Sequence, residues 1–218
     1  DWRKAGSTSN VCAGTTRKTM IQILPFSPQY ADGVVSVILP IQQTEFDIPI
    51  TLNAKVEQFI QYFQTDIRER FVTYLSRSRR YIPFMRKLLK EQGMPEDLVY
   101  IALIESGFDP SAYSRSKASG PWQFISQTGK RYGLKVNWWV DERRDPEKST
   151  IAAAKHLKDL YGRFECWYLA AAGYNAGESK IVRAMKRYRT EDFWSLTNHR
   201  YLKRETKNYV PQMIAAAL

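Results

Sequence analysis

One carboxylate, Glu105, stands directly after an apolar run and has the residue type of a general acid. Residues 98–104 are almost entirely apolar, and Ser106 and Gly107 follow Glu105 at once. A run this apolar is typical of a helix that is buried on most sides. Burial disfavours a charged carboxylate, and the partial negative charge of a helix C-terminus acts in the same direction. We therefore expect a raised pKa for Glu105, as a proton donor to a glycosidic oxygen requires, unless the side chain turns out to solvent.

A second candidate lies in the stretch SRSKASGPWQF. The dipeptide Gly120-Pro121 predicts a tight turn. Directly after it, Trp122 and Gln123 offer an aromatic face and an amide, a combination that can bind a sugar ring. The alternative is that Trp122 is an interior residue at the start of a helix.

Two further candidates carry hydroxyl and amide groups. Gly173 and Gly177 bracket Tyr174 and Asn175 between two helical patterns. The glycines would let the chain reverse and present both polar side chains on one side, although an ordinary turn between helices has the same composition. Tyr209, in the segment ETKNYVP, by itself predicts only an aromatic core residue.

The elements that must position these residues are predicted to be helices. Asn53 and Asp145 have the residue type of helix N-caps, and Gly93 and Gly107 suit left-handed helix ends. Residues 1–45 differ, being rich in Ser, Thr, Gly and Pro with one strand-like run at 33–41, and predict an extended arm. The fold class is therefore mostly α with an extended N-terminal arm. Helices are expected at 53–67, from Pro83 to 92, at 95–105, 145–164, 167–188 with a break around 173–177, and 204–218 with a kink or restart at Pro211.

Composition limits the partners without choosing one. The chain of 218 residues has 33 Lys and Arg against 22 Asp and Glu, a formal charge of +11. This favours polyanions such as nucleic acid, anionic lipid or an acidic cell-wall polymer. The two cysteines, Cys12 and Cys166, lack the spacing of a metal site, and two interpretations stay open: a bridge between them, or Cys166 as a small core residue.

Taken together, the candidate stretches resemble the lytic murein transglycosylases of the soluble-lytic and goose-type-lysozyme-like superfamily, and among them the membrane-bound D type. The matching segments are FDIPITLN, ESGFDPSAYSRSKASGPWQF, AGYNAGE and ETKNYVP, in this order. The resemblance covers residues 46–218 and implies a lysozyme-like catalytic domain there, with residues 1–45 as an arm or linker. It also implies peptidoglycan glycan strands as the partner, and neither metal nor cofactor. The expected location is the periplasm or cell envelope of a bacterium, as a monomer with peripheral association with the outer membrane.

The resemblance implies that Glu105 is the single catalytic acid and base. It would protonate the oxygen between N-acetylmuramic acid and N-acetylglucosamine, and then accept the proton of the muramyl C6 hydroxyl as that oxygen attacks C1. The product would be a 1,6-anhydromuramyl end, formed without water. The resemblance implies five further site residues. Ser106 and Gln123 would line the glycan groove, and Tyr174 and Asn175 would contact the N-acetyl group and sugar. Tyr209 would form a hydrogen bond with Glu105.

Three other functions stay open on the sequence. A peptidoglycan-binding domain without turnover would keep the groove and lose the reaction, which Glu105 in its Glu-Ser context argues against. A lysozyme-type muramidase would hydrolyse the same bond to a reducing end. Nucleic-acid binding depends on the +11 charge alone, because the chain shows no recognised nucleic-acid-binding motif.

Overall fold

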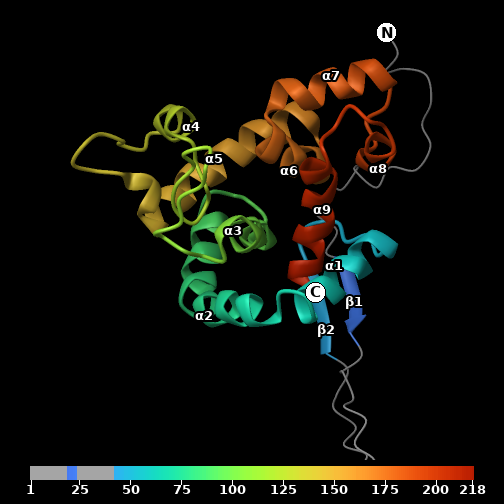
Figure 1. The fold of residues 1–218 in the computed structure, drawn as a ribbon, viewed down its shortest axis with the longest axis horizontal. Helices are drawn as coiled ribbons and strands as arrows, with labels where there is room; N and C mark the ends of the chain where they lie inside the picture. The colour runs from blue at the N-terminus through green and yellow to red at the C-terminus, as the bar shows by residue number, and fades with distance from the viewer. Residues whose placement is uncertain (1–18, 24–41) are drawn as a thin grey trace, which may run out of the picture.

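The structure is mostly helical, as expected. The computed structural model describes residues 19–23 and 42–218 (Figure 1). Strands β1 (Thr19–Ile23) and β2 (Gln42–Phe46) form an antiparallel pair with Thr19 opposite Phe46, and the strand expected at 33–41 lies outside the described residues. The helical elements are α1 (Ala54–Gln64), α2 (Arg68–Glu91), the 3-10 helix η2 (Glu96–Leu98), α3 (Val99–Ser106), α4 (Ser126–Arg131), the 3-10 helix η3 (Glu142–Arg144), α5 (Pro146–Phe164), α6 (Trp167–Ala176), α7 (Glu178–Tyr188), α8 (Phe193–Thr197) and α9 (Arg204–Ala217).

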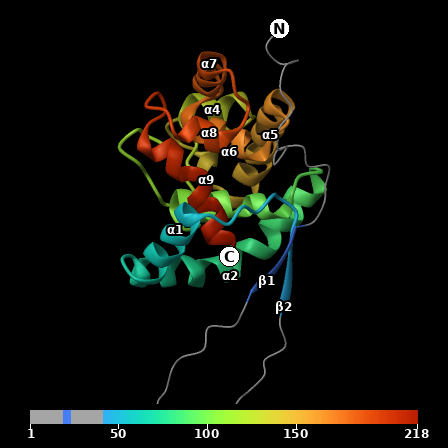
Figure 2. The same cartoon turned by 90° about the vertical axis from the view of Figure 1, so that its right-hand side faces the viewer.

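Helix α3 lies at the centre of this arrangement. It packs against α2 on one side and α9 on the other (Figure 1). Val99, Ile101, Ala102 and Leu103 are fully buried, which explains the continuous apolar run in the sequence. The β1–β2 pair lies at the opposite end of the molecule from α7, as Figures 1 and 2 show from two sides.

The start of α3 is fixed by a reciprocal pair of aspartates. Asp47 accepts hydrogen bonds from the backbone N–H groups of Glu96 and Asp97, at 2.5 and 3.0 Å. Asp97 in turn accepts from the backbone N–H of Asp47 at 2.8 Å and from Arg86 at 2.6 Å. Burial raises the pKa of Asp97 to about 6. These contacts tie the segment before α1 to the element that carries Glu105.

The predicted helix caps are confirmed. The Asn53 side chain accepts hydrogen bonds from the backbone N–H groups of Lys55 and Val56 at the start of α1. The Asp145 side chain caps α5 in the same way. At helix ends, Gly93 and Gly107 have φ angles of 69° and 60°, in the left-handed region that glycine tolerates. Local sequence signals therefore determine these boundaries.

The prediction that a helix begins at Pro83 is wrong. Helix α2 begins at Arg68 and runs through Pro83, changing direction along its length (Figure 1). Proline lacks an N–H and cannot form the helical hydrogen bond at its position, but it does not prevent packing on either side. Phe71 stacks on Phe63 of α1 before the proline, and Met85 and Leu89 are fully buried after it.

The expected break between residues 173 and 177 is narrower than predicted. Helix α6 continues through Gly173, Tyr174 and Asn175, and only Gly177, with φ 87°, separates it from α7. Gly173 serves packing instead, because a Cβ there would lie 2.9 Å from a ring carbon of Phe164 in α5. Tyr174 and Asn175 therefore project from the last turn of a helix. At the C-terminus, α9 continues through Pro211 without a restart.

Candidate active site

Glu105 lies in the last turn of α3, where Gly107 ends the helix. A Cβ at position 107 would lie 1.9 Å from the ring of Tyr74 on α2, and the φ of 60° is itself unfavourable for other residues. Glycine is therefore required for α2 and the end of α3 to approach this closely. This contact fixes the point at which the chain turns away from Glu105.

The Glu105 side chain is partly exposed and has one hydrogen-bond donor in the structure. Tyr209 of α9 donates its hydroxyl hydrogen to Oε1 of Glu105 at 2.5 Å. Burial raises the pKa of Glu105 from 4.5 to about 7, the Tyr209 hydrogen bond opposes this shift, and the negative charge of Glu205 adds to it. The direction predicted from the sequence is confirmed, and so is the Tyr209 contact. The carboxyl group can therefore exchange a proton near neutral pH.

Two tyrosines beside Glu105 remain protonated. Burial raises the pKa of both Tyr174 and Tyr209 well above 10, and the charge of Glu105 contributes to each shift. Tyr174 donates its hydroxyl hydrogen to the backbone carbonyl oxygen of Trp122 at 2.7 Å. Tyr174 therefore holds the 120–124 turn, and its hydroxyl hydrogen is already used in a hydrogen bond within the protein.

The expectation that Trp122 offers a face to a sugar ring is wrong. Its side chain is fully buried, and its Nε1 donates a hydrogen bond to Oγ1 of Thr150 at 2.9 Å. The alternative interpretation, an interior tryptophan, is confirmed. Because the ring is enclosed, it anchors the turn to α5 and takes no part in binding at the surface.

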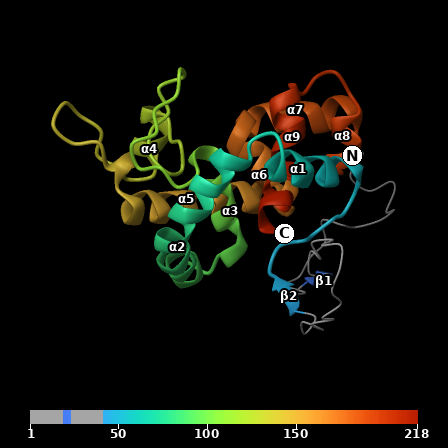
Figure 3. The same cartoon turned by 60° about the horizontal axis from the view of Figure 1, so that its bottom comes forward.

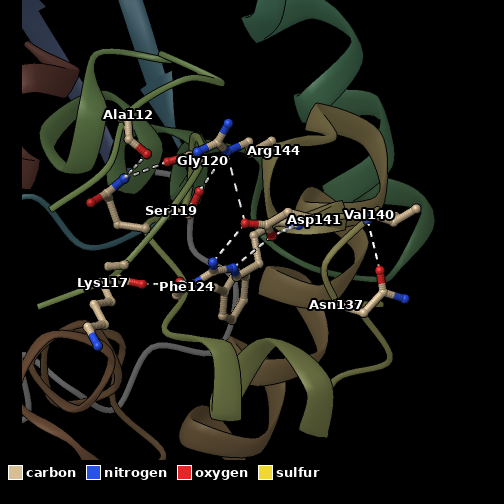
Figure 4. Close-up of polar contacts among 12 residues, drawn as sticks. Ala112, Lys117, Ser119, Gly120, Phe124, Asn137, Val140, Asp141 and Arg144 are labelled. Atoms are coloured by element: carbon tan, nitrogen blue, oxygen red, sulfur yellow. Dashed lines mark hydrogen bonds and ion pairs between the residues drawn. The ribbon is translucent and has the colours of Figure 1, made fainter.

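Ser106 holds the same turn against the end of α3, and Gln123 bonds within this turn and to the segment after α3. Ser106 Oγ lies 2.9 Å from the carbonyl oxygen of Pro121, to which it donates, and it accepts from the backbone N–H of Asp109 at 3.1 Å. Gln123 Nε2 donates to the carbonyl oxygens of Gly120 at 2.8 Å and Ala112 at 3.3 Å; these two acceptor residues are labelled in Figure 4. The structure thus brings both residues to the turn beside Glu105, while their role in a glycan groove stays a prediction.

Asn175 joins the end of α6 to the start of α9. Its Nδ2 donates to Glu205 Oε1 at 3.3 Å, and its Oδ1 accepts from Thr206 Oγ1 at 2.9 Å. These bonds bring Asn175 next to Glu205, the carboxylate that raises the pKa of Glu105. Asn175 therefore belongs to the same region as Glu105 without contacting it directly.

Comparison with protein families decides what this arrangement is. The family model described as "Transglycosylase SLT domain" matches residues 83–197, more than half of the chain. The chain belongs to this family. The matched range includes Glu105, Ser106, Gln123, Tyr174 and Asn175, whereas Tyr209 lies beyond it.

Several curated proteins are similar to this SLT domain. The membrane-bound lytic murein transglycosylase D of Escherichia coli K12 is 41% identical over 144 residues, which cover 64% of this chain and 31% of that protein. A putative tributyltin chloride resistance protein of an Alteromonas species is 35% identical over 111 residues, covering 50% of this chain and 54% of that protein. The chain thus spans about a third of the E. coli relative's length.

A solved structure confirms the lysozyme-like fold class expected of this SLT domain. The 70 kDa soluble lytic transglycosylase SLT70 of Escherichia coli superimposes with a TM-score of 0.54 at 18% sequence identity. The match covers 76% of this chain and 30% of that one. At this identity the likeness shows the fold alone.

Glu205, which lies beyond the matched range, is one residue near Glu105 that sequence reasoning missed. It lies four residues before Tyr209 on α9, so both side chains occupy one face of the helix. The signal was present in the segment ETKNYVP, where the glutamate is at the i, i+4 spacing from the tyrosine. Its effect on Glu105 could not be read from the sequence, because it depends on how α9 packs against α3.

His156 was missed as well, and it lies beneath Tyr174. Its ring is 5.0 Å from that of Tyr174 and 4.8 Å from that of Tyr132, measured between centroids. Burial lowers the pKa of His156 to about 4, so the imidazole is neutral at physiological pH. Its buried Nδ1 has no hydrogen-bond partner within the part of the chain that the structure describes. The histidine therefore supports the ring of Tyr174 as an uncharged aromatic group.

Other features of the SLT domain lie apart from these residues. An apolar cavity of about 890 Å³ is bordered by α1, α2 and the end of α9, and no candidate site residue lines it. Within residues 19–23 and 42–218, no group of three His, Cys, Asp or Glu side chains is placed to hold a metal ion. The same ranges contain no helix long and apolar enough to cross a membrane. Cys166 is buried and is not a free thiol, while Cys12 lies outside the described residues.

Proposed function

We propose that this SLT domain is a lytic transglycosylase that cleaves the β-1,4 bond between N-acetylmuramic acid and N-acetylglucosamine in peptidoglycan. The observation that carries the proposal is the state of Glu105 at the end of a buried helix. Its carboxyl group has a pKa of about 7 and accepts a hydrogen bond from the Tyr209 hydroxyl. The relatives, which include a membrane-bound lytic murein transglycosylase, support the same substrate class. The resemblance in sequence to the family begins at residue 46, and we propose residues 46–218 as the catalytic domain.

In the first step, Glu105 acts as the general acid. With a pKa of about 7, roughly half of the molecules carry the proton at neutral pH. The proton passes to the bridging oxygen while the bond from that oxygen to C1 of the muramyl residue breaks. Tyr209 keeps Oε1 oriented. Its pKa is well above 10, so its hydroxyl stays protonated at this pH and donates its hydrogen to Oε1. We propose that the other carboxyl oxygen, Oε2, carries the proton that is transferred.

In the second step, the same group acts as the general base. The carboxylate formed in the first step accepts the proton of the muramyl C6 hydroxyl, and the C6 oxygen forms a bond to C1. The Glu105 proton is thereby restored, and the product carries a 1,6-anhydro ring. No water enters, so one titratable group with a pKa near the working pH is sufficient for both transfers.

The neighbouring acids do not supply the second carboxylate that ordinary glycosidases use. Asp109 forms an ion pair with Arg77 at 3.2 Å and caps the following turn by accepting from the backbone N–H of Ser111 at 2.8 Å. Glu205 accepts a hydrogen bond from Asn175, and its negative charge raises the pKa of Glu105. We therefore propose Glu105 as the single acid and base.

The remaining residues are proposed as the substrate-binding side of the site. Gln123 Oε1 makes no hydrogen bond with any described residue and can accept one from a sugar hydroxyl or amide. Ser106 keeps the turn that carries Gln123 in place. Tyr174 and Asn175 are proposed at the N-acetyl group, where Tyr174 acts by holding the Trp122 carbonyl and Asn175 by its partly exposed amide.

The proposed setting is the bacterial cell envelope or periplasm, where a monomeric domain acts on glycan strands. The +11 charge favours an acidic polymer of this kind. Peripheral association with a membrane is part of the proposal.

A digest of purified sacculi tests the proposed reaction. The products are separated and weighed by mass spectrometry, because an anhydromuramyl end is lighter than a hydrolytic end by one water. Anhydro products support the transglycosylase. Reducing ends would identify a muramidase, and binding without either product would identify a domain that binds peptidoglycan without turnover.

A further inference from the structure

The segment between α4 and η3 presents two neighbouring tryptophans to solvent. Trp138 and Trp139 are 90% and 88% exposed, and Val140 after them is 44% exposed. Figures 1 and 3 show this segment, in yellow, projecting beyond the helices. Tryptophan is highly buried on average, so two adjacent exposed rings followed by an exposed valine indicate a surface that meets something apolar.

The tip that carries the tryptophans is an ordered hairpin. Val136 and Asp141 form an antiparallel bridge across its base. The Asn137 side chain accepts hydrogen bonds from the backbone N–H groups of Trp139 and Val140, each at 2.9 Å, and the bond to Val140 is drawn in Figure 4. The backbone N–H of Asn137 also donates to the Val140 carbonyl oxygen at 2.9 Å. These contacts fix the conformation that exposes the rings.

Arg143 connects the hairpin to the body of the domain. Its guanidinium is buried, binds Asp141 at 2.7 and 2.8 Å, and donates to the carbonyl oxygens of Lys117 and Phe124. These three partner residues are labelled in Figure 4. Gly120 allows the close approach, because a Cβ there would lie 1.8 Å from the carbonyl oxygen of Arg143. The hairpin is thus fixed to the turn that Gln123 and Ser106 hold beside Glu105.

The charge around the hairpin is positive. Lys130 and Arg131 at the end of α4, and Lys135 at the start of the hairpin, are all exposed. None of the three forms an ion pair with another residue in the described ranges, although Arg131 lies over the ring of Tyr132. These cations are therefore available to an external anion.

The acidic side chains of the hairpin are already bound within the protein. Asp141 is held by Arg143, and Glu142 forms an ion pair with Lys148 at 2.6 Å. Contact with Arg143 lowers the pKa of Asp141 and contact with Lys148 lowers that of Glu142, so both stay charged and paired. Their charges oppose an external anion less than free carboxylates would.

We propose that this hairpin docks the domain on an anionic phospholipid bilayer. The rings of Trp138 and Trp139 would enter the interfacial region, which tryptophan favours because its ring is apolar and its N–H is polar. The nearby cations would face the lipid phosphates, to which lysine and arginine side chains at a membrane surface are attracted. Docking would hold the site at a membrane while glycan is cleaved, but it does not depend on the proposed reaction.

The degree of exposure favours lipid over sugar. A tryptophan that stacks on a sugar uses one face of its ring and usually rests the other face on protein. At about 90% exposure, neither face of Trp138 or Trp139 is supported in this way. A bilayer interface surrounds an inserted side chain, so full exposure before binding is what docking on lipid requires.

Vesicle binding by the 218-residue chain tests the proposal. Vesicles of phosphatidylethanolamine and phosphatidylglycerol at three to one are compared with vesicles of phosphatidylcholine alone, by sedimentation and by tryptophan fluorescence. We expect binding to the anionic vesicles with a shift of the emission to shorter wavelength. W138A/W139A should weaken this binding about tenfold or more. K130Q/R131Q/K135Q should weaken it on anionic vesicles and reduce its dependence on salt.

The matched control is V72A/L75A, which removes two exposed apolar side chains of α2 that are 57% and 45% exposed. It should bind vesicles as the unaltered chain does. The proposal is overturned if W138A/W139A binds anionic vesicles unchanged, or if the unaltered chain binds none. Loss of retention on sacculi in W138A/W139A, without vesicle binding by either protein, would assign the hairpin to glycan instead. Vesicle binding that requires the tryptophans supports docking whether or not sacculi are digested.

Discussion

Tyr209 donates its hydroxyl hydrogen to Glu105 at 2.5 Å, across 104 positions of the sequence. This hydrogen bond joins the last turn of α3 to the middle of α9. It stabilises the charged form of Glu105, while burial and the charge of Glu205 stabilise the protonated form. The balance gives a group that can both donate and accept a proton near pH 7.

Replacing Tyr209 by Phe should slow the reaction and shift its pH profile upward. The hydroxyl lowers the pKa of Glu105, so its loss raises that pKa, and the fall of kcat/KM at alkaline pH should begin at a higher pH. Misorientation of the carboxyl group should reduce the maximum rate roughly tenfold to a hundredfold. Tyr188→Phe is the control, because the Tyr188 hydroxyl makes no hydrogen bond with a described residue. Equal profiles for both variants would exclude a positioning role for Tyr209.

Replacing Glu205 by Gln should shift the same profile in the opposite direction. The negative charge of Glu205 raises the pKa of Glu105, and removing it lowers that pKa toward its ordinary value. The rate should then fall at a lower pH than in the unaltered chain, and the difference should shrink at high salt because exposed charges are screened. Gln keeps an oxygen that can accept from Asn175. An upward shift, or none at low salt, would contradict this assignment.

Local signals in the sequence were sufficient for much of the fold. Asn53, Asp145 and Gly107 determine helix boundaries through contacts within a few residues, and their roles were predicted correctly. Pro83 and Gly173 were interpreted as helix boundaries and lie within helices instead, because packing between α1 and α2 and between α5 and α6 outweighs local preference.

The site shows the same division between local and tertiary information. Glu105 was a candidate acid from the apolar run, which also gave the direction of its pKa shift, whereas its contact with Tyr209 was expected only from the family resemblance. The sequence left the burial of Trp122 open as one of two interpretations, and it did not indicate the influence of Glu205 on Glu105. Both depend on which surfaces meet in three dimensions: α5 against the 120–124 turn, and α9 against α3.

The two glycines Gly162 and Gly173 give a test of helix packing. Gly173→Ala should destabilise the fold by roughly 1–3 kcal/mol, because the new Cβ would lie 2.9 Å from Phe164 and 3.1 Å from Leu160. Gly162→Ala in α5 meets no atom within 4 Å and should stabilise it by up to about 1 kcal/mol. Denaturant unfolding followed by circular dichroism measures both. Equal effects of the two substitutions would show that close packing at Gly173 has no energetic consequence.

The raised pKa of Glu105 also predicts how stability changes with pH. A carboxyl group whose pKa rises from 4.5 to about 7 on folding binds its proton more tightly in the folded state. Its contribution to stability is therefore present below pH 4.5 and lost as the pH rises through 7. The unfolding free energy of Glu105→Gln minus that of the unaltered chain is the quantity to compare at two pH values. This difference should be higher at pH 8 than at pH 4 by roughly 1–3 kcal/mol. Glu69→Gln, at an exposed position of α2, is the control substitution.

The most direct test of Glu105 as the single acid and base is the rate at which Glu105→Gln releases anhydromuramyl products from purified sacculi. The amide keeps the shape of the side chain and can still meet Tyr209, but it can neither donate nor accept the proton. We expect the rate to fall by about a hundredfold or more, while retention on sacculi is unchanged. Glu205→Gln at pH 6 should keep most of its activity. Release by Glu105→Gln at more than about a tenth of the original rate would contradict the assignment of Glu105 as the acid and base.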